Sequence, residues 1–136
     1  MDHWAKKYIG KPWVKDGQGP DAFNCWGFVR FVFKEQCGVY IPEVDVDAMS
    51  LLAVVRTFKS KELHADWEKQ ETPQDMDGVE LSHAKDPHHV GIWLDVDGGG
   101  VLHCVKGIGV MFSSVHNLRL SGWNIRGFWR HKCKLQ

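Results

Sequence analysis

Residues 24–38 read NCWGFVRFVFKEQCG, and this stretch decides the fold. Its apolar residues recur at near-helical spacing, which predicts an amphipathic helix. Asn24 is a favourable N-cap, and Gly38 supplies a stop just after Cys37. The helix is therefore expected to begin at Cys25. At the first turn of a helix, unpaired N–H groups and the helix dipole stabilise a thiolate, so we expect the pKa of Cys25 to lie below the ~8.5 of a free cysteine.

The segments that flank this helix are expected to be helical as well. Residues 4–9 predict a short first helix. Residues 45–70 predict one or two helices, the first supported by an apolar set between positions 46 and 58. Leu63 and Trp67 support a weaker second helix.

The sequence after Pro73 is expected to form strands, because its apolar period shortens towards two. The run Asp97-Gly98-Gly99-Gly100 is a strong hairpin signal. The candidate strands are Gly78–Leu81, His88–Val96, Gly100–Lys106, Val110–Ser114 and Ile125–His131. Helices followed by a run of antiparallel strands predict an α+β domain.

The four cysteines, at positions 25, 37, 104 and 133, are expected to be free thiols. Twelve residues of helix would hold Cys25 and Cys37 ~18 Å apart, which is too far for a disulfide. The chain has no Cys-x-x-Cys pair, so a structural zinc site is poorly supported. We expect the three cysteines other than Cys25 to be small buried hydrophobes.

Two histidines are candidates to act with Cys25. His89 lies in one expected strand and His103 lies in the next, across the glycine-rich turn. If the connecting loop has an odd number of residues centred on Val96, the two imidazoles sit opposite each other on one face of the sheet. An even loop would place them on opposite faces. The odd register gives a nucleophile, a base and an orienting group, the arrangement of a thiol hydrolase.

Two glycines suggest where the cysteine helix packs. Gly27 lies inside the helix and Gly91 lies inside the strand that carries His89. Glycine is unfavourable in both positions and often marks a close approach of another element. We therefore expect the helix to lie closely on that strand.

A metal site is the alternative use of Cys25, His89 and His103, since a thiolate and two imidazoles suit zinc. The sequence offers no fourth ligand and no group to orient the ligands. We rank this interpretation below hydrolysis and expect no metal or other cofactor.

Composition limits the remaining possibilities. The 136 residues are 43% apolar, which fits one compact domain over residues 1–136. The 17 basic and 17 acidic residues cancel, which argues against a nucleic-acid partner. No apolar run approaches the ~20 residues of a membrane span, and no polybasic segment suggests a membrane partner. The first residues lack a secretion signal, so we expect synthesis in the cytoplasm.

Three motifs resemble those of the NlpC-type cell-wall cysteine peptidases. The first covers YIGKPW at residues 8–13 and GPDAFNCWGFVR at residues 19–30. The second is HVGIW at residues 89–93, and the third is VLHC at residues 101–104. The Cys-Trp-Gly variant, with GFWR at residues 127–130, is similar to the phage-tail branch of the family.

The resemblance implies a papain-like α+β fold, with the catalytic helix packed on a small antiparallel sheet. It implies that Cys25 is the nucleophile, that His89 is the general base and then the acid, and that His103 fixes the tautomer of His89. The implied substrate is a peptidoglycan stem peptide, cut between D-glutamate and diaminopimelate through a thioester. The implied partners are other phage-tail proteins, and the implied location is the virion tail, from which the chain would act on the cell wall.

Two positions depart from the family pattern, which has aspartate before the cysteine and serine after it. Here they are Asn24 and Trp26, and we expect both to contact substrate. Neither brings a charge to pair with a free amine, so a longer peptide or another amide stays open. The alternatives to a wall peptidase are a structural tail module with little activity, or another thiol amidase or acyltransferase.

Overall fold

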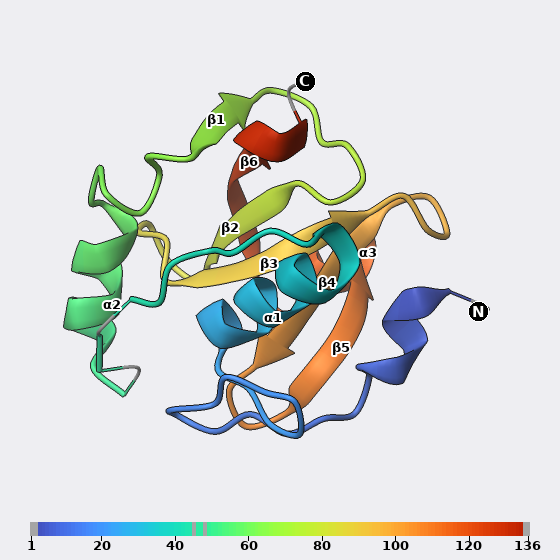
Figure 1. Cartoon of the computed structure of the whole chain (residues 1–136), viewed down its shortest axis with the longest axis horizontal. Coiled ribbons are helices and arrows are strands. Elements are labelled where there is room, and N and C mark those ends of the chain that lie inside the picture. The colour runs from blue at the N-terminus through green and yellow to red at the C-terminus, as the bar shows by residue number, and fades with distance from the viewer. Residues whose placement is uncertain (1–2, 45, 48, 135–136) are drawn as a thin grey trace.

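The computed structural model describes residues 3–44, 46–47 and 49–134. One six-stranded sheet, with every pair of neighbours antiparallel, forms the centre of the fold (Figure 1). Its strands are β1 (Trp67–Gln70), β2 (Gly78–Ser82), β3 (His89–Leu94), β4 (Gly100–Val105), β5 (Gly109–Ser114) and β6 (Asn124–His131). The order across the sheet is β1-β6-β2-β3-β4-β5. The predicted α+β class is confirmed, and all five candidate strands are present with small shifts at their ends.

The helices are α1 (Cys25–Cys37), α2 (Leu51–Phe58) and α3 (Val115–Leu120), with short 3₁₀ turns at Trp4–Lys7 (η1) and Lys132–Lys134 (η2). The Asn24 side chain accepts a hydrogen bond from the Gly27 N–H, and Gly38 ends α1 in the left-handed conformation, at φ 68°. Both predicted ends of this helix are therefore confirmed. Helix α1 packs its apolar face on β3 and β4. None of the described helices is long and apolar enough to cross a membrane.

The core lies on both faces of the sheet. On the α1 side, Val90, Ile92 and Leu94 of β3 pack with the buried phenylalanines of the helix. The opposite face carries a second cluster that includes Trp93, Leu118 and Trp123. The alternation along β3 follows from strand geometry, and it sends His89 to the second face.

The predicted second helix near Trp67 is wrong. Residues 61–66 form turns, and Trp67–Gln70 form the edge strand β1, which pairs with β6. A four-residue strand is too short to show its own period, and its pairing partner lies some sixty residues later in the sequence. The first helix of this region is the eight-residue α2, and position 45, where the prediction starts, lies outside the described residues.

The hairpin that carries the two histidines is centred on Asp97 rather than Val96. Ile92 pairs with Leu102 and Leu94 pairs with Gly100, so His103 lies across from Gly91 and diagonal to His89. Moving the centre of the hairpin by one residue shifts the pairing between β3 and β4 by two residues. The imidazoles of His89 and His103 therefore still share a face.

The two glycines do not mark the contact between helix and strand, although α1 does lie on β3. A Cβ at Gly27 would meet the carbonyl oxygen of Gly17 in the preceding loop. A Cβ at Gly91 would meet the side chains of Val101 and His103 on β4. Gly27 therefore lets the loop approach the helix, and Gly91 makes room for the His103 side chain.

The four cysteines are free, as predicted. Cys104 is buried and its Sγ donates to the carbonyl oxygen of Phe23 at 3.4 Å. Cys37 and Cys133 are only half-buried, because they lie at the end of α1 and in η2, near the molecular surface.

An ion pair between a buried carboxylate and a partly buried guanidinium joins β6 to the residue that precedes β2. This residue, Asp77, accepts hydrogen bonds from Nε and Nη2 of Arg130 on β6 at 2.9 and 2.8 Å. We expect Asp77→Ala to lower the free energy of unfolding by about 3 kcal/mol, because it leaves the guanidinium without its partner. Asp86→Ala, which breaks the exposed pair with Lys59, should cost less than about 1 kcal/mol. Urea unfolding of both variants checks the difference, and equal losses would contradict this account.

Candidate active site

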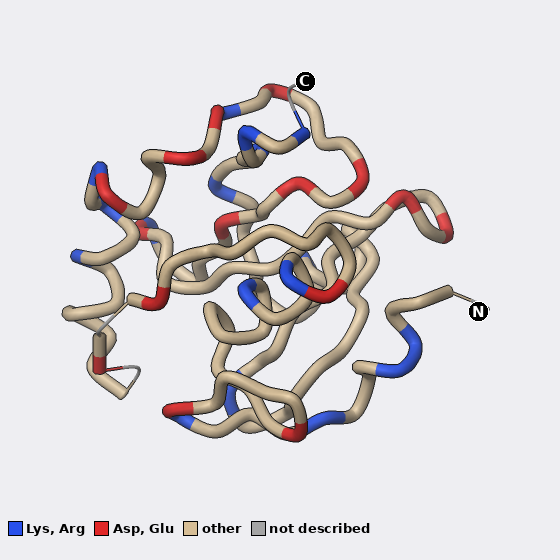
Figure 2. Tube along the Cα trace, in the orientation of Figure 1, with Lys and Arg blue, Asp and Glu red and all other residues tan. Residues whose placement is uncertain are grey.

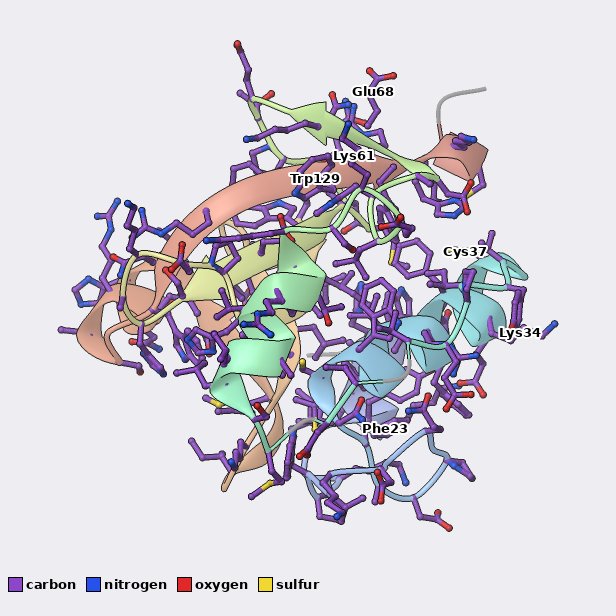
Figure 3. The ribbon with its side chains drawn as sticks, turned by 90° about the vertical axis from the view of Figure 1, so that its left-hand side faces the viewer. Phe23, Lys34, Cys37, Lys61, Glu68 and Trp129 are labelled. Carbon is purple, nitrogen blue, oxygen red and sulfur yellow. The ribbon has the colours of Figure 1, made fainter. Side chains whose placement is uncertain are left out.

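Cys25 lies at the first turn of α1 and borders a cavity of about 390 Å³. We refer to it as the Cys25 cavity. Residues from five parts of the chain line it: the loop before α1 with the start of that helix, described residues between Val44 and Leu63, the region around His89, the end of β4 at Val105 and Lys106, and Trp123. Figure 3 views the molecule from the side on which α2, part of the second segment, lies in front.

The pKa of the Cys25 thiol is raised to about 11, because burial disfavours the thiolate. Hydrogen bonds from the backbone N–H groups of Val90, Trp26 and Cys25 itself act in the opposite direction and are outweighed. The predicted lowering of this pKa is therefore wrong. The helix start does direct N–H groups at the sulfur, but the desolvation of the thiolate outweighs them.

His89 and His103 are joined in a buried chain of hydrogen bonds. His89 Nε2 lies 2.9 Å from His103 Nδ1, and His103 Nε2 lies 3.0 Å from the Ser113 hydroxyl on β5. All three side chains are buried. The chain can run in either direction, and only the direction in which His89 donates to His103 leaves His89 Nδ1 with a free lone pair.

Burial lowers the pKa of both imidazoles. The pKa of His103 falls to about 4, and that of His89 lies well below 6.5, with neighbouring His103, His88 and His83 lowering it further. Burial costs a charged imidazole more solvation free energy than a neutral one, and here no carboxylate of the described residues compensates for that cost. In the resting protein near pH 7, Cys25 and His89 are therefore a neutral thiol and a neutral imidazole.

The indole ring of Trp123 stacks on the imidazole ring of His89. The two rings stack with centroids 4.6 Å apart at 22°, and the other face of the indole stacks on His83 at 3.6 Å. His88 Nε2 accepts from the His83 N–H, and both of these histidines also border the Cys25 cavity. The stacking leaves His89 little freedom to rotate.

Ser113 and Trp123 also belong to this site, and neither was predicted from the sequence. Ser113 could be found only from the register of β4 and β5, and the Gly-rich segment between those strands allows several registers. Trp123 follows α3 and reaches His89 from a part of the chain with no motif.

Asn24 and Trp26, the two expected substrate contacts, both border the Cys25 cavity. The Asn24 amide is already engaged: Oδ1 accepts from the Gly27 N–H at 2.7 Å, and Nδ2 donates to the Lys15 carbonyl at 2.9 Å. The Trp26 indole N–H donates to the carbonyl oxygen of Pro42 at 3.1 Å, which leaves its ring as the surface offered to a ligand. Their contact with substrate stays a prediction.

The metal alternative finds no support in the arrangement of side chains. Within residues 3–44, 46–47 and 49–134, no three His, Cys, Asp or Glu side chains are placed to hold a metal ion together. The two imidazoles that would be its ligands are instead hydrogen-bonded to each other.

The buried imidazole of His103 predicts acid sensitivity of the fold. The unfolded chain binds a proton at this residue near pH 6.5, and the folded chain does so only near pH 4. Between these values the unfolded state holds more protons, so the free energy of unfolding falls as the pH falls, by roughly 3 kcal/mol for this group. Urea unfolding at pH 7.0 and 4.5 measures the loss. His103→Gln should lose clearly less stability over this interval, and an equal loss in both proteins would refute the assignment.

The fold and the site together define the class of the protein. A helix that begins at a cysteine, packed on an antiparallel sheet that presents a hydrogen-bonded histidine to the same cavity, is the framework of a cysteine peptidase domain. The model of the NlpC/P60 family matches residues 10–126. The chain belongs to the NlpC/P60 family.

The relatives agree with this assignment. The chain is 30% identical over 128 residues to the probable endopeptidase p60 of Listeria grayi, a match that covers 93% of the chain and 21% of that protein. A shorter match, 46% identical over 39 residues, joins 28% of the chain to 9% of the gamma-DL-glutamyl hydrolase of Bacillus subtilis (strain 168). The chain thus spans about a fifth of the length of the Listeria relative, and the Bacillus match covers less than a tenth of that protein.

Solved structures give the same result. The NlpC/p60 domain of the peptidoglycan hydrolase SagA matches with a TM-score of 0.60 and 25% identity, over 93% of this chain and 91% of that one. NlpC2 from Trichomonas vaginalis matches with a TM-score of 0.62 and 15% identity, over 93% of this chain and 44% of that one, which supports the fold alone.

Proposed function

We propose that this chain is a cysteine endopeptidase that hydrolyses the stem peptides of peptidoglycan. The observation that carries the proposal is that Cys25 and His89 border one cavity, with His89 backed by the buried chain to His103 and Ser113. The family supplies the substrate class, since SagA is named a peptidoglycan hydrolase and the Listeria relatives are named endopeptidases.

In the proposed mechanism, the neutral pair of Cys25 and His89 reacts in one step with the bound peptide. As Sγ forms its bond to the scissile carbonyl carbon, its proton passes to Nδ1 of His89. Nε2 of His89 donates to His103, which fixes the tautomer that can accept this proton. The backbone N–H of Cys25, in the first turn of α1 where N–H groups have no partner within the helix, donates to the oxyanion.

The remaining steps complete acylation and then return the enzyme to its starting state. The carbon–nitrogen bond breaks, and His89 gives its proton to the leaving amine, so a thioester remains on Cys25. Water then attacks the thioester carbonyl while His89 removes its proton. The carbon–sulfur bond breaks, the new carboxylic acid leaves, and the thiol is restored. A neutral His89 at neutral pH is the form that each half-reaction requires.

We propose the bond between D-glutamate and diaminopimelate as the site of cleavage, as the family resemblance implies. Digestion of purified peptidoglycan by the wild type and by Cys25→Ala, with the released fragments identified by mass, tests both the activity and the bond. Fragments that require Cys25 and carry a new carboxyl terminus at D-glutamate support the proposal. Release of nothing by either protein from several wall types would reject a wall peptidase. Another acyl substrate or a structural role would then be favoured.

We also propose an association with a phage or prophage tail, which would deliver the chain to the cell wall. The support is the Cys-Trp-Gly form of the first motif and the GFWR stretch of β6. Figure 2 shows acidic and basic residues interspersed around the periphery, a distribution that suits contacts with other proteins more than with nucleic acid. Mass spectrometry of purified virions from a strain that carries the gene tests this location.

A further inference from the structure

One wall of the Cys25 cavity is apolar and comes from a single part of the chain. Eight lining residues lie between positions 44 and 63, and all but Thr57 are apolar; Phe58 belongs to the core, and the other six form this wall. They are Val44, Val46, Met49, Leu51, Val54 and Leu63. We call this set the apolar wall.

Helix α2, which contributes Leu51 and Val54 to the apolar wall, packs on the core through Phe58 and Val54 and leaves its first residues exposed. It reads LLAVVRTF, with one charged residue, yet Phe58 is its only buried residue. Leu51 is 63% exposed and the preceding Met49 is 52% exposed. The helix has a marked apolar face, and such a face ordinarily packs against other apolar surface. Among the described elements, α2 makes no extensive contact with any other helix or strand, and it lies at the edge of the molecule in Figure 1.

The rest of the cavity lining is mixed, with Trp13, Trp26, Val105 and Trp123 beside polar residues. Its polar groups include the Cys25 thiol, His88 and His89, with Gln18 and Asn24 from the loop before α1. A ligand that spans the cavity would therefore meet polar groups at its reacting carbonyl and hydrocarbon at its other end. Pockets of a few hundred Å³ with a largely apolar lining and a few polar groups are typical of small-molecule sites.

We propose that the apolar wall is a subsite for the hydrocarbon part of the acyl group that is transferred to Cys25. The acyl group is the part of the substrate that stays attached to Sγ through both half-reactions, so a surface next to Sγ contacts it throughout. The occupant is an aliphatic side chain or chain segment near the scissile carbonyl. This subsite rests on the proposed role of Cys25 as nucleophile.

Activated esters test the subsite separately from the natural substrate. With p-nitrophenyl acetate, butyrate and octanoate, the carbon–oxygen bond of the ester breaks, a carbon–sulfur bond forms at Cys25, and the thiol proton leaves with p-nitrophenol. The burst of p-nitrophenol gives the acylation rate. Because each buried methylene favours binding, we expect the wild-type rate to rise at least about tenfold from acetate to octanoate.

Two substitutions on adjacent residues of α2 provide the variant and its control. Val54→Asp places a carboxylate in the apolar wall and should bring the three rates to within about twofold of one another. Val55→Asp introduces the same residue on the same helix but does not border the cavity, so it should retain the wild-type rise. Val54→Thr is a milder substitution of similar shape, for use if Val54→Asp does not fold. Its rise in rate from acetate to octanoate should lie between those of Val54→Asp and Val55→Asp. Thermal melts establish that each variant is folded.

The outcomes separate the two proposals. A burst that requires Cys25 but does not depend on chain length would reject the subsite and retain the nucleophile. A chain-length dependence that survives in Val54→Asp would also reject the subsite. Absence of a burst with all three esters would reject both the subsite and the proposed role of Cys25. If the protein digests peptidoglycan but shows no chain-length preference among the esters, only the subsite is rejected.

Discussion

Cys25→Ala is expected to keep its fold and to lose hydrolysis of stem peptides by roughly 10⁵-fold or more. The side chain is replaced by a smaller one at the border of a cavity, so the core under α1 is not disturbed. Without the sulfur no thioester forms, and the imidazole of His89 has no nucleophile to activate. Release of amines from a soluble stem peptide measures the loss, and a thermal melt measures the stability.

A second cysteine gives the control for this substitution. Cys133 is half-buried in η2 and does not border the cavity, so Cys133→Ala should retain wild-type rates. If Cys25→Ala keeps more than about a hundredth of the wild-type rate, another group supplies the nucleophile and the proposed mechanism is wrong.

His89→Ala is expected to lower kcat/KM by about 10³-fold or more, because the general base and acid are both removed. The thiol of Cys25, whose pKa is raised to about 11, is almost entirely protonated at neutral pH and depends on this base. His116, exposed on α3, provides the control, and His116→Ala should leave the rate unchanged.

A double substitution tests whether the two groups work as one unit. If His89 acts only through Cys25, the pair Cys25→Ala and His89→Ala should be no slower than Cys25→Ala alone. A further drop of tenfold or more in the double variant would mean that His89 contributes by a separate route, such as direct contact with substrate.

Much of the fold could be predicted because its signals are local. The cap at Asn24 and the glycine at position 38 define α1, and the alternation of residues in β3 places His89 and Trp93 on one face. The parts that were wrong depend on contacts far along the chain. Strand β1 exists because β6 offers an edge to Trp67–Gln70, and no pattern within four residues can show that.

The site could be predicted in its identity but not in its electrostatics. Any connecting loop with an odd number of residues keeps His89 and His103 on one face, so their shared face survives an error of one residue in the centre of the hairpin. The pKa of Cys25 depends on how completely the sulfur is enclosed, which is a property of packing in three dimensions. Ser113 and Trp123 were not predicted for the same reason, because each contacts the histidines only in the folded structure.

Capture of the covalent intermediate is the most direct test of the central claim that Cys25 is the nucleophile of an endopeptidase. The wild-type protein is mixed with a stem peptide, quenched with acid during turnover, and weighed intact by mass spectrometry. We predict an increase equal to the mass of the new-carboxyl product less one water, located by digestion on the peptide that contains Cys25. Formation of product with the Cys25 peptide unmodified throughout turnover, or an acyl group on another residue, would contradict the account.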